Sequence, residues 1–318
     1  MPHRRYACLV LGMHRSGTSA LAHLLAELGA DLPLRLNPPG PDNPEGYFEP
    51  AALVALHDRL LAAGGSAWFD FKPFALGAIP AEAARALLAE MAQVIAEDYP
   101  DAPLALIKDP RMCRFVPLAR EVLGALGLEV AVVLALRHPS EVAASLARRD
   151  PMSATYAGFL WARHVIAAER DSRDLPRVTV AYADMMADWR ATAARIRSLP
   201  GPWRVEDPAD APLKAELRHH RGLDAVETFG PRLGPRLEAL HEALTGLAGA
   251  DDAAQHARID AAARAVMAIA TRESDLLEAE YLHRRLSTPN PLWASTDPAG
   301  DRAALALLFD ALHRAPAP

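Results

Sequence analysis

The feature that most constrains the fold is a glycine loop near the N-terminus, between a predicted buried strand and a predicted helix. Residues 9–11 are Leu-Val-Leu, residues 12–19 read GMHRSGTS, and residues 20–28 have helical character. Gly12 and Gly17 let the backbone turn sharply and approach a ligand closely. The first N–H groups of a helix have no helical partner and point at whatever lies at the helix start. We therefore predict an anion cradle made by Gly12, His14, Arg15, Ser16, Gly17, Thr18 and Ser19.

The loop departs from the Walker A phosphate-binding pattern at one informative position. In that pattern, G-x-x-x-x-G-K-[ST], a lysine reaches the β- and γ-phosphates of a nucleotide. Thr18 stands at the lysine position here, and the basic residue of the loop is Arg15. The sequence thus predicts a phosphate cradle without the lysine that ATP and GTP hydrolases use. A plain packing turn between strand and helix is the alternative interpretation.

Composition narrows the class of protein. The chain has 318 residues, 51% of them hydrophobic, which is enough for a large core. The formal net charge of -6 argues against a protein that coats nucleic acid. Cys8 and Cys113 lack disulfide or metal-ligand spacing, and none of the 12 histidines forms an H-E-x-x-H pattern, so we expect no metal. The apolar run at residues 7–13 is too short for a secretion signal, and no stretch has bilayer length, so we expect a cytoplasmic protein.

Strand and helix signals alternate through the first two thirds of the chain. Strands are predicted at residues 8–11, 104–107, 129–136 and 177–181, and helices at 18–28, 50–63, 81–98, 115–126, 140–148, 154–171 and 184–199. This alternation predicts a parallel sheet covered by helices. A loop rich in Pro and Asp follows at 200–213, and then helices are predicted at 232–247, 253–285 and 303–314. We predict a core at 1–199 and a mostly helical extension at 200–318 within the same domain.

A second motif joins an arginine and a serine across a strand-to-helix turn. Arg137 follows a strongly apolar strand, Pro139 suits a first helical turn, and Ser145 lies two turns further on. An arginine can fork onto a phosphate, and a serine hydroxyl can donate to the same group. Ligands of parallel sheets bind at the carboxyl ends of the strands, so Arg15, Lys108 and Arg137 should converge. Together the two motifs indicate a ligand with two separate phosphate groups.

These motifs resemble those of sulfotransferases that depend on 3′-phosphoadenylylsulfate (PAPS). Residues 12–21 resemble the loop that holds the 5′-phosphosulfate in that family, and Arg137 with Ser145 resembles the element that holds the 3′-phosphate. Residues 107–110, Ile-Lys-Asp-Pro, resemble a turn of tyrosylprotein sulfotransferases whose lysine is catalytic.

The resemblance extends over residues 7–199. Residues 43–49, NPEGYFE, followed by residues 57–61, HDRLL, resemble bacterial members of the family. Residues 180–184, VAYAD, resemble its later strand–Tyr-x-Asp element. The resemblance implies a P-loop-NTPase-like three-layer α/β fold, with a central parallel sheet covered by helices and a mainly helical C-terminal part.

The implied reaction moves a sulfuryl group from PAPS to a hydroxyl or amine and releases adenosine 3′,5′-bisphosphate. Arg15 and Lys108 would stabilise the charge that grows on the bridging oxygen. A general base must take the acceptor proton, and we expect Glu49, with Glu45 second and His57 third. No metal is implied, and the acceptor could be a small molecule, glycan, lipid or peptide.

Several assignments stay open at the level of sequence. Arg218 and Arg221 belong to a basic cluster, Arg-His-His-Arg, that would either reach the cofactor 3′-phosphate or form a solvated face. Trp68 and Phe69 would either line the acceptor cleft or belong to the core. A divergent kinase or NTPase, with Asp109 as its acidic Mg²⁺ residue, is one alternative function. A non-catalytic nucleotide-binding protein on the same fold is another.

Overall fold

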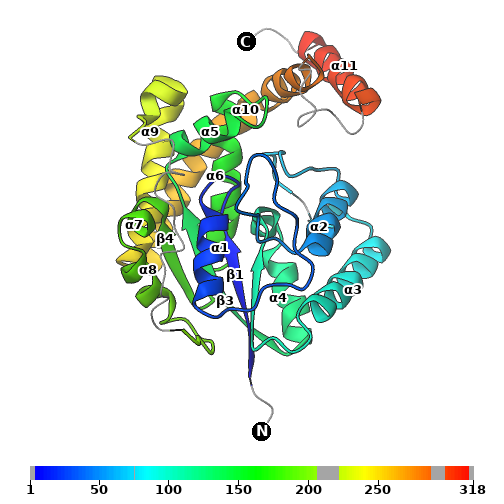
Figure 1. The fold of residues 1–318 in the computed structure, drawn as a ribbon. Helices are drawn as coiled ribbons and strands as arrows, with labels where there is room; N and C mark the ends of the chain where they lie inside the picture. Colours follow the sequence, from blue (N-terminus) through cyan, green and yellow to red (C-terminus); the bar gives the residue numbers. More distant parts are fainter. Residues whose placement is uncertain (1–3, 75, 206–221, 288–297, 315–318) are drawn as a thin grey trace.

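A parallel β-sheet forms the centre of the molecule in the computed structural model, which describes residues 4–74, 76–205, 222–287 and 298–314. Its four strands are β1 (Arg5–Leu11), β2 (Leu104–Lys108), β3 (Leu128–Leu136) and β4 (Arg177–Ala181). They are ordered β2-β1-β3-β4, with every pairing parallel. Figure 1 shows helices around this sheet on both sides. The predicted α/β class with a central parallel sheet is confirmed.

The alternation of side chains along β1 builds a separate apolar core on each face of the sheet. Ala7, Leu9 and Leu11 belong to one cluster of buried residues, whereas Cys8 and Val10 belong to the other. This follows from the period of two in a strand, and a strand with apolar side chains at both parities must be covered on both faces.

Three helices cover the face that contains Cys8: α1 (Thr18–Glu27), α7 (Tyr182–Ala187) and α8 (Trp189–Ile196). The opposite face is covered by α2 (Ala51–Ala63), α3 (Ala81–Asp98), α4 (Val116–Ala125), α5 (Pro139–Ala147) and α6 (Ala154–Arg170). The chain therefore leaves β1 for one face and leaves its neighbours β2 and β3 for the other. Such a reversal opens a crevice at the carboxyl ends of the strands, and that is where ligands bind in open α/β sheets.

The C-terminal part is helical, and its helices α9 (Ala225–Thr245) and α10 (Ala253–Ser287) pack on the same core as α6. The C-terminal part also contains α11 (Pro298–Arg314). Leu237 and Leu240 of α9 and Val266 of α10 are fully buried in the cluster that also contains Phe159 and Trp161 of α6. Figure 1 shows α11 at the far end of α10, away from the sheet. None of the helices in the described ranges is both long and apolar enough to cross a bilayer.

The structure corrects several boundaries. The single helix predicted at 184–199 is divided into α7 and α8 at Asp188, which has extended backbone and accepts a hydrogen bond from the Ala191 N–H. A helical stretch from Ala225 was not predicted; it precedes a break at Gly230 (φ 78°, ψ 171°), and the helical part of α9 after this break begins close to the predicted start at 232. Short 3₁₀ helices were not predicted at Leu76–Ala78 (η1), Pro110–Arg114 (η2) and Gly246–Ala248 (η4).

Candidate active site

The loop between β1 and α1 folds tightly enough to aim the helix N-terminus into a cavity. Gly12 lies so close to β3 that a Cβ there would be 2.6 Å from the Ala135 carbonyl oxygen. Its N–H donates to the Cys113 Sγ of η2 over 3.1 Å. Arg15 (φ 67°) and Gly17 (φ 81°) both adopt the left-handed conformation. Helix α1 has no side-chain cap at Gly17, so its first N–H groups remain available to an anion.

Gly17 is required by packing as well as by its backbone angle. A Cβ on Gly17 would lie 2.2 Å from the ring of Tyr182, the first residue of α7. The Arg137 guanidinium lies over the same ring, 4.6 Å from its centroid. The tyrosine ring therefore contacts both the glycine of the cradle and the arginine of the second motif, and fixes one relative to the other.

The two predicted anion-binding elements contact each other through Arg15. The Arg15 Nε donates to the Ser145 Oγ of α5 over 3.0 Å. The Arg137 Nη1 donates to the Arg15 carbonyl oxygen over 3.0 Å, and its Nε donates to Glu141 over 2.9 Å. A left-handed non-glycine residue costs about 1–3 kcal/mol, and the bond from Arg137 helps to hold Arg15 in that conformation.

The electrostatic environment of Arg15 is suited to an anion. Burial, and next the charge of Arg149, lower the pKa of Arg15, while Asp42 acts in the opposite direction. Burial is also the first cause that lowers the pKa of His14 well below its ordinary value, with Arg149 second. His14 is therefore neutral near pH 7, and a bound anion would relieve the repulsion between the arginines.

Lys108 brings an ammonium group to the first turn of α1 from the neighbouring strand. It is the last residue of β2 rather than the residue after it, and it lies beside Val10 of β1. Its Nζ donates to the Glu49 Oε1 over 2.6 Å, to the Tyr47 carbonyl over 3.0 Å and to the Ser19 Oγ over 3.3 Å. Only 2% of Lys108 and 7% of Glu49 is exposed. A buried lysine is thus held close to the loop whose own lysine position is Thr18.

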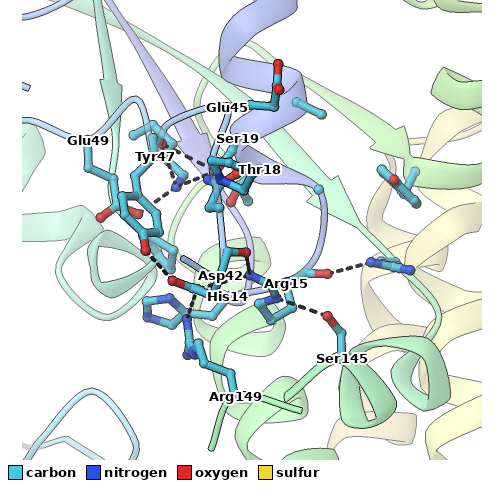
Figure 2. Close-up of a pocket in the computed structure, with 18 of the residues that line it drawn as sticks. His14, Arg15, Thr18, Ser19, Asp42, Glu45, Tyr47, Glu49, Ser145 and Arg149 are labelled. Atoms are coloured by element: carbon cyan, nitrogen blue, oxygen red, sulfur yellow. Dashed lines mark hydrogen bonds and ion pairs between the residues drawn. The ribbon is translucent and has the colours of Figure 1, made fainter. Parts of the chain in front are cut away.

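The segment 37–49 places a carboxylate against the cradle. Asp42 pairs with Arg15 over 3.3 Å and with Arg149 over 3.8 Å, and it accepts a hydrogen bond from the Tyr47 hydroxyl. Figure 2 shows Asp42 beside these three side chains. Burial first, and then the bond to Asp42, raise the pKa of Tyr47 to about 12, so its hydroxyl stays protonated as a donor. Asp42 thus pairs with the two arginines, Arg15 and Arg149, that a bound anion would otherwise contact.

These elements enclose a cavity of about 490 Å³ at the carboxyl ends of the strands. The predicted site residues that line it are His14, Arg15, Gly17, Thr18, Ser19, Glu45, Glu49, Lys108, Arg137 and Ser145. Two predicted members, Gly12 and Ser16, lie behind its surface, and the buried Ser16 Oγ has no hydrogen-bond partner among the described residues. Arg218 and Arg221 lie outside the described residues.

Three of the other candidates, Trp68, Phe69 and His57, do not line the cavity directly, although the Trp68 ring lies 4.8 Å from that of His14, which does. Trp68 and Phe69 pack instead against the core cluster around α6. His57 is fully buried and its Nδ1 shares a hydrogen bond with the Asp109 Oδ2 over 2.8 Å. Without a path to the cavity, His57 is a poor candidate for the general base. Glu45 reaches the cavity from an exposed position, whereas Glu49 lies at its buried end beside Lys108.

Asp109 is committed to a buried ion-pair network. Its Oδ1 accepts from the Arg111 backbone N–H and pairs with the Arg111 Nη1, each over 3.0 Å. Burial alone would raise the Asp109 pKa, but the Arg111 charge and the His57 hydrogen bond outweigh burial and hold the pKa below its usual range. Asp109 has no exposed surface and is not among the residues that line the cavity, so it is not placed to hold a nucleotide-bound Mg²⁺.

Sequence reasoning missed part of the cavity wall. Asp42, Tyr47, Arg148, Arg149 and Tyr182 line it without having been assigned a binding role. One signal was present, since Arg149 lies only four residues after Ser145, in the turn just beyond the end of α5. Asp42 offered no local signal, because its role depends on a loop that folds back over α1.

Comparisons with known proteins carry no argument about this chain. No family model matches the chain, and no curated protein matches it. Among solved structures, the sulfotransferase domain from the Synechococcus PCC 7002 olefin synthase is similar at 19% sequence identity, over 62% of this chain and 74% of that chain, with a TM-score of 0.36. An overlap this weak says nothing about chemistry, which has to be judged from the cavity itself.

Proposed function

We propose that the protein is a sulfotransferase that moves a sulfuryl group from PAPS to a hydroxyl or amine acceptor and releases adenosine 3′,5′-bisphosphate. The observation that supports this proposal is the contact, on one cavity, between the two elements predicted to bind anions. The cradle at α1 and the Arg137–Ser145 element meet through Arg15. A nucleotide with phosphates on both its 5′ and 3′ positions matches this arrangement better than one with a single phosphate chain.

The charges around the cavity favour a polyanion although the whole chain is acidic. The cavity is lined by five arginine or lysine side chains and by three carboxylates. The chain as a whole carries a formal net charge of -6. Cationic side chains gathered in a cleft raise the local concentration of anionic ligands, whatever the net charge elsewhere.

In the proposed reaction Lys108 and Glu49 act on opposite sides of the transferred group. The acceptor oxygen or nitrogen bonds to sulfur while the bond from sulfur to the bridging oxygen breaks, and the bridging oxygen keeps the electron pair. Lys108 donates a hydrogen bond to that oxygen as charge develops on it. Glu49 takes the proton from the acceptor. Since the two side chains are paired in the structure, substrate entry must separate them.

The amount of positive charge in the site explains why the proposal needs no metal ion. Arg15 lies at the cradle and Lys108 at the first turn of α1, and these are the two sides from which the bridging oxygen would be reached. The acceptor is proposed only as a small molecule, glycan, lipid or peptide that carries a hydroxyl or amine.

Calorimetric titration with nucleotides tests this function. We expect adenosine 3′,5′-bisphosphate to bind without any divalent ion and to bind more tightly than ATP with Mg²⁺. At a ligand concentration of about 100 times Kd, binding should also stabilise the fold by about 2.7 kcal/mol in thermal unfolding. Tighter binding of ATP, dependent on Mg²⁺, would contradict the proposal and favour a kinase or NTPase.

A further inference from the structure

A cluster of two histidines and one glutamate lies outside the cavity. His138 directly precedes helix α5, and Glu238 and His241 lie three residues apart on α9, where side chains share one face. One potential ligand atom from each side chain lies within 4.8 Å of those of the other two. The cluster is formed by segments about a hundred residues apart, so no local sequence motif indicates it.

Among the described residues, the contacts within the cluster do not include a hydrogen bond to every imidazole nitrogen of the cluster. The His138 Nε2 shares a hydrogen bond with the Glu238 Oε2 over 2.8 Å, and the rings of His138 and His241 meet edge to face with centroids 5.0 Å apart. The His138 Nδ1 is buried without a hydrogen-bond partner among the described residues. The side chains of His138 and Glu238 remain 21% and 38% exposed, so an ion can reach them from solvent.

We propose that His138, Glu238 and His241 bind a divalent transition-metal ion, with Zn²⁺ as the best fit. Two imidazole nitrogens and one carboxylate oxygen form a ligand set that zinc uses in sites with one open position. Imidazole ligands suit zinc, copper, iron and nickel, whereas magnesium and calcium require mostly oxygen ligands. A tetrahedral ion with bonds of about 2.1 Å separates its ligands by about 3.4 Å, so small side-chain rotations suffice to close the cluster.

An ion in this cluster would affect the cavity, because the cluster lies next to a residue of the cavity wall. Arg137 of the cavity immediately precedes His138, and its carbonyl oxygen accepts a hydrogen bond from the Trp161 Nε1 over 3.1 Å. An ion held by His138 and by α9 would tie the C-terminal helices to the segment that carries Arg137. Because the ion binds only the folded arrangement, it stabilises that arrangement in proportion to its affinity.

The test is equilibrium dialysis of the chelator-treated full chain against Zn²⁺. We expect one tightly bound ion per chain, and an affinity at least about tenfold lower in Glu238→Gln and in His241→Gln. Two controls should keep the wild-type affinity. His23→Gln removes a histidine that pairs with Glu27 on the surface of α1, and a double change, His219→Gln with His220→Gln, removes the adjacent histidines of the basic cluster.

A second readout uses the fluorescence of the wild-type chain. The Trp161 ring lies 6.3 Å from the His241 ring, so Cu²⁺ in the cluster should quench its fluorescence, and Zn²⁺ in excess should restore it. Trp161→Phe should remove most of the quenched signal. The assignment is overturned if the wild-type chain takes up no stoichiometric Zn²⁺, or if the binding of Zn²⁺ is lost in the His219/His220 variant and unchanged in His241→Gln.

Discussion

Lys108 and Glu49 form an ion pair that must separate in the proposed reaction. Both are buried, and their hydrogen bond of 2.6 Å is supported by the Tyr47 carbonyl and the Ser19 hydroxyl on the lysine side and by the Asn37 amide on the carboxylate side. Two opposite charges held in this way are oriented before any substrate arrives. Burying both charged groups has a large desolvation penalty, so the pair is better explained by a role in the reaction than by a contribution to stability.

We expect Lys108→Ala to lower kcat by at least about a hundredfold, because one donor to the developing oxyanion is lost. The Kd of adenosine 3′,5′-bisphosphate should change much less, since the cradle and Arg137 remain. Steady-state kinetics and calorimetry on the same preparation measure both. Lys72→Ala is the matched control, because Lys72 also pairs with a glutamate, Glu278, but lies away from the cavity. An unchanged kcat in Lys108→Ala would exclude the proposed role.

Asp109 has a role in stability that pH should reveal. Its pKa is held below the usual range in the folded state by Arg111 and His57. A carboxyl group with a depressed folded-state pKa contributes stability above its unfolded pKa of about 3.9, and this contribution is lost as pH falls toward the folded-state value.

We therefore expect Asp109→Asn to lower the free energy of unfolding by about 3–5 kcal/mol at pH 5–7, because it leaves Arg111 and His57 without their buried partner. The difference from wild type should shrink below about pH 4. Urea unfolding across this pH range measures it. Asp58→Asn is the control, since Asp58 pairs with the same Arg111 from a half-exposed position and should cost little. A difference that does not vary with pH would contradict the assignment.

Among the elements, the loop that carries Asp42 is the one that we expect ligand binding to alter most. The Asp42 carboxylate pairs with Arg15 of the cradle and with Arg149 of the cavity wall. A phosphate entering the cradle must replace this carboxylate or bind beside it. The segment is held by a few polar contacts, among them the bond from the Asn43 amide to the Ser19 Oγ over 3.2 Å.

We expect Asp42→Asn to tighten the binding of adenosine 3′,5′-bisphosphate, because the ligand no longer displaces or faces a negative charge. An ion pair of this kind is worth up to about 1 kcal/mol, which corresponds to about a fivefold lower Kd. Calorimetry measures the change. Asp174→Asn, which removes an exposed pair with Arg120, should leave Kd unchanged. Weaker binding in Asp42→Asn would show that Asp42 positions Arg15 rather than competing with the ligand.

Elements with a strong local signal could be predicted from the sequence, and contacts between distant elements could not. The cradle follows from the spacing of Gly12 and Gly17 between a strand and a helix, and helix Ala81–Asp98 and strand Arg177–Ala181 have the predicted bounds. The break between α7 and α8 depends on the side-chain cap of Asp188, which helix propensity did not predict. The cluster of His138, Glu238 and His241 forms only when α9 packs beside α5, so no local pattern could predict it.

At the scale of the whole molecule, helices α9 and α10 of the C-terminal part contribute side chains to the same core as the sheet and α6. A Cβ on Gly158 of α6 would lie 2.9 Å from Leu237 and 3.0 Å from Phe229, so α6 and α9 approach each other closely. Leu237 is fully buried, and its cluster continues through α6 to the sheet. That residues 200–318 belong to the same domain as residues 1–199 stays a prediction, which cooperative unfolding of the chain would test.

We expect Leu237→Ala to lower the free energy of unfolding by about 2–5 kcal/mol through loss of buried surface and the cavity that it leaves. The chain should still unfold in one transition that includes the sheet. Denaturant unfolding followed by circular dichroism and by tryptophan fluorescence tests both points. Leu276→Ala on α10 is the control, because that side chain is 62% exposed and should cost little. Separate transitions from the two probes would divide the chain into two domains.

The central claim is that Arg137 binds a 3′-phosphate in the same cavity in which the cradle binds a 5′-phosphate. The most direct measurement compares adenosine 3′,5′-bisphosphate with adenosine 5′-monophosphate, by calorimetry, in wild type and in Arg137→Gln. We expect the 3′-phosphate to tighten wild-type binding by about 10- to 100-fold, as a charge-assisted hydrogen bond of about 1.5–3 kcal/mol implies, and to give no advantage in Arg137→Gln. A 3′-phosphate preference that persists in the variant, or that is absent from wild type, would contradict the account.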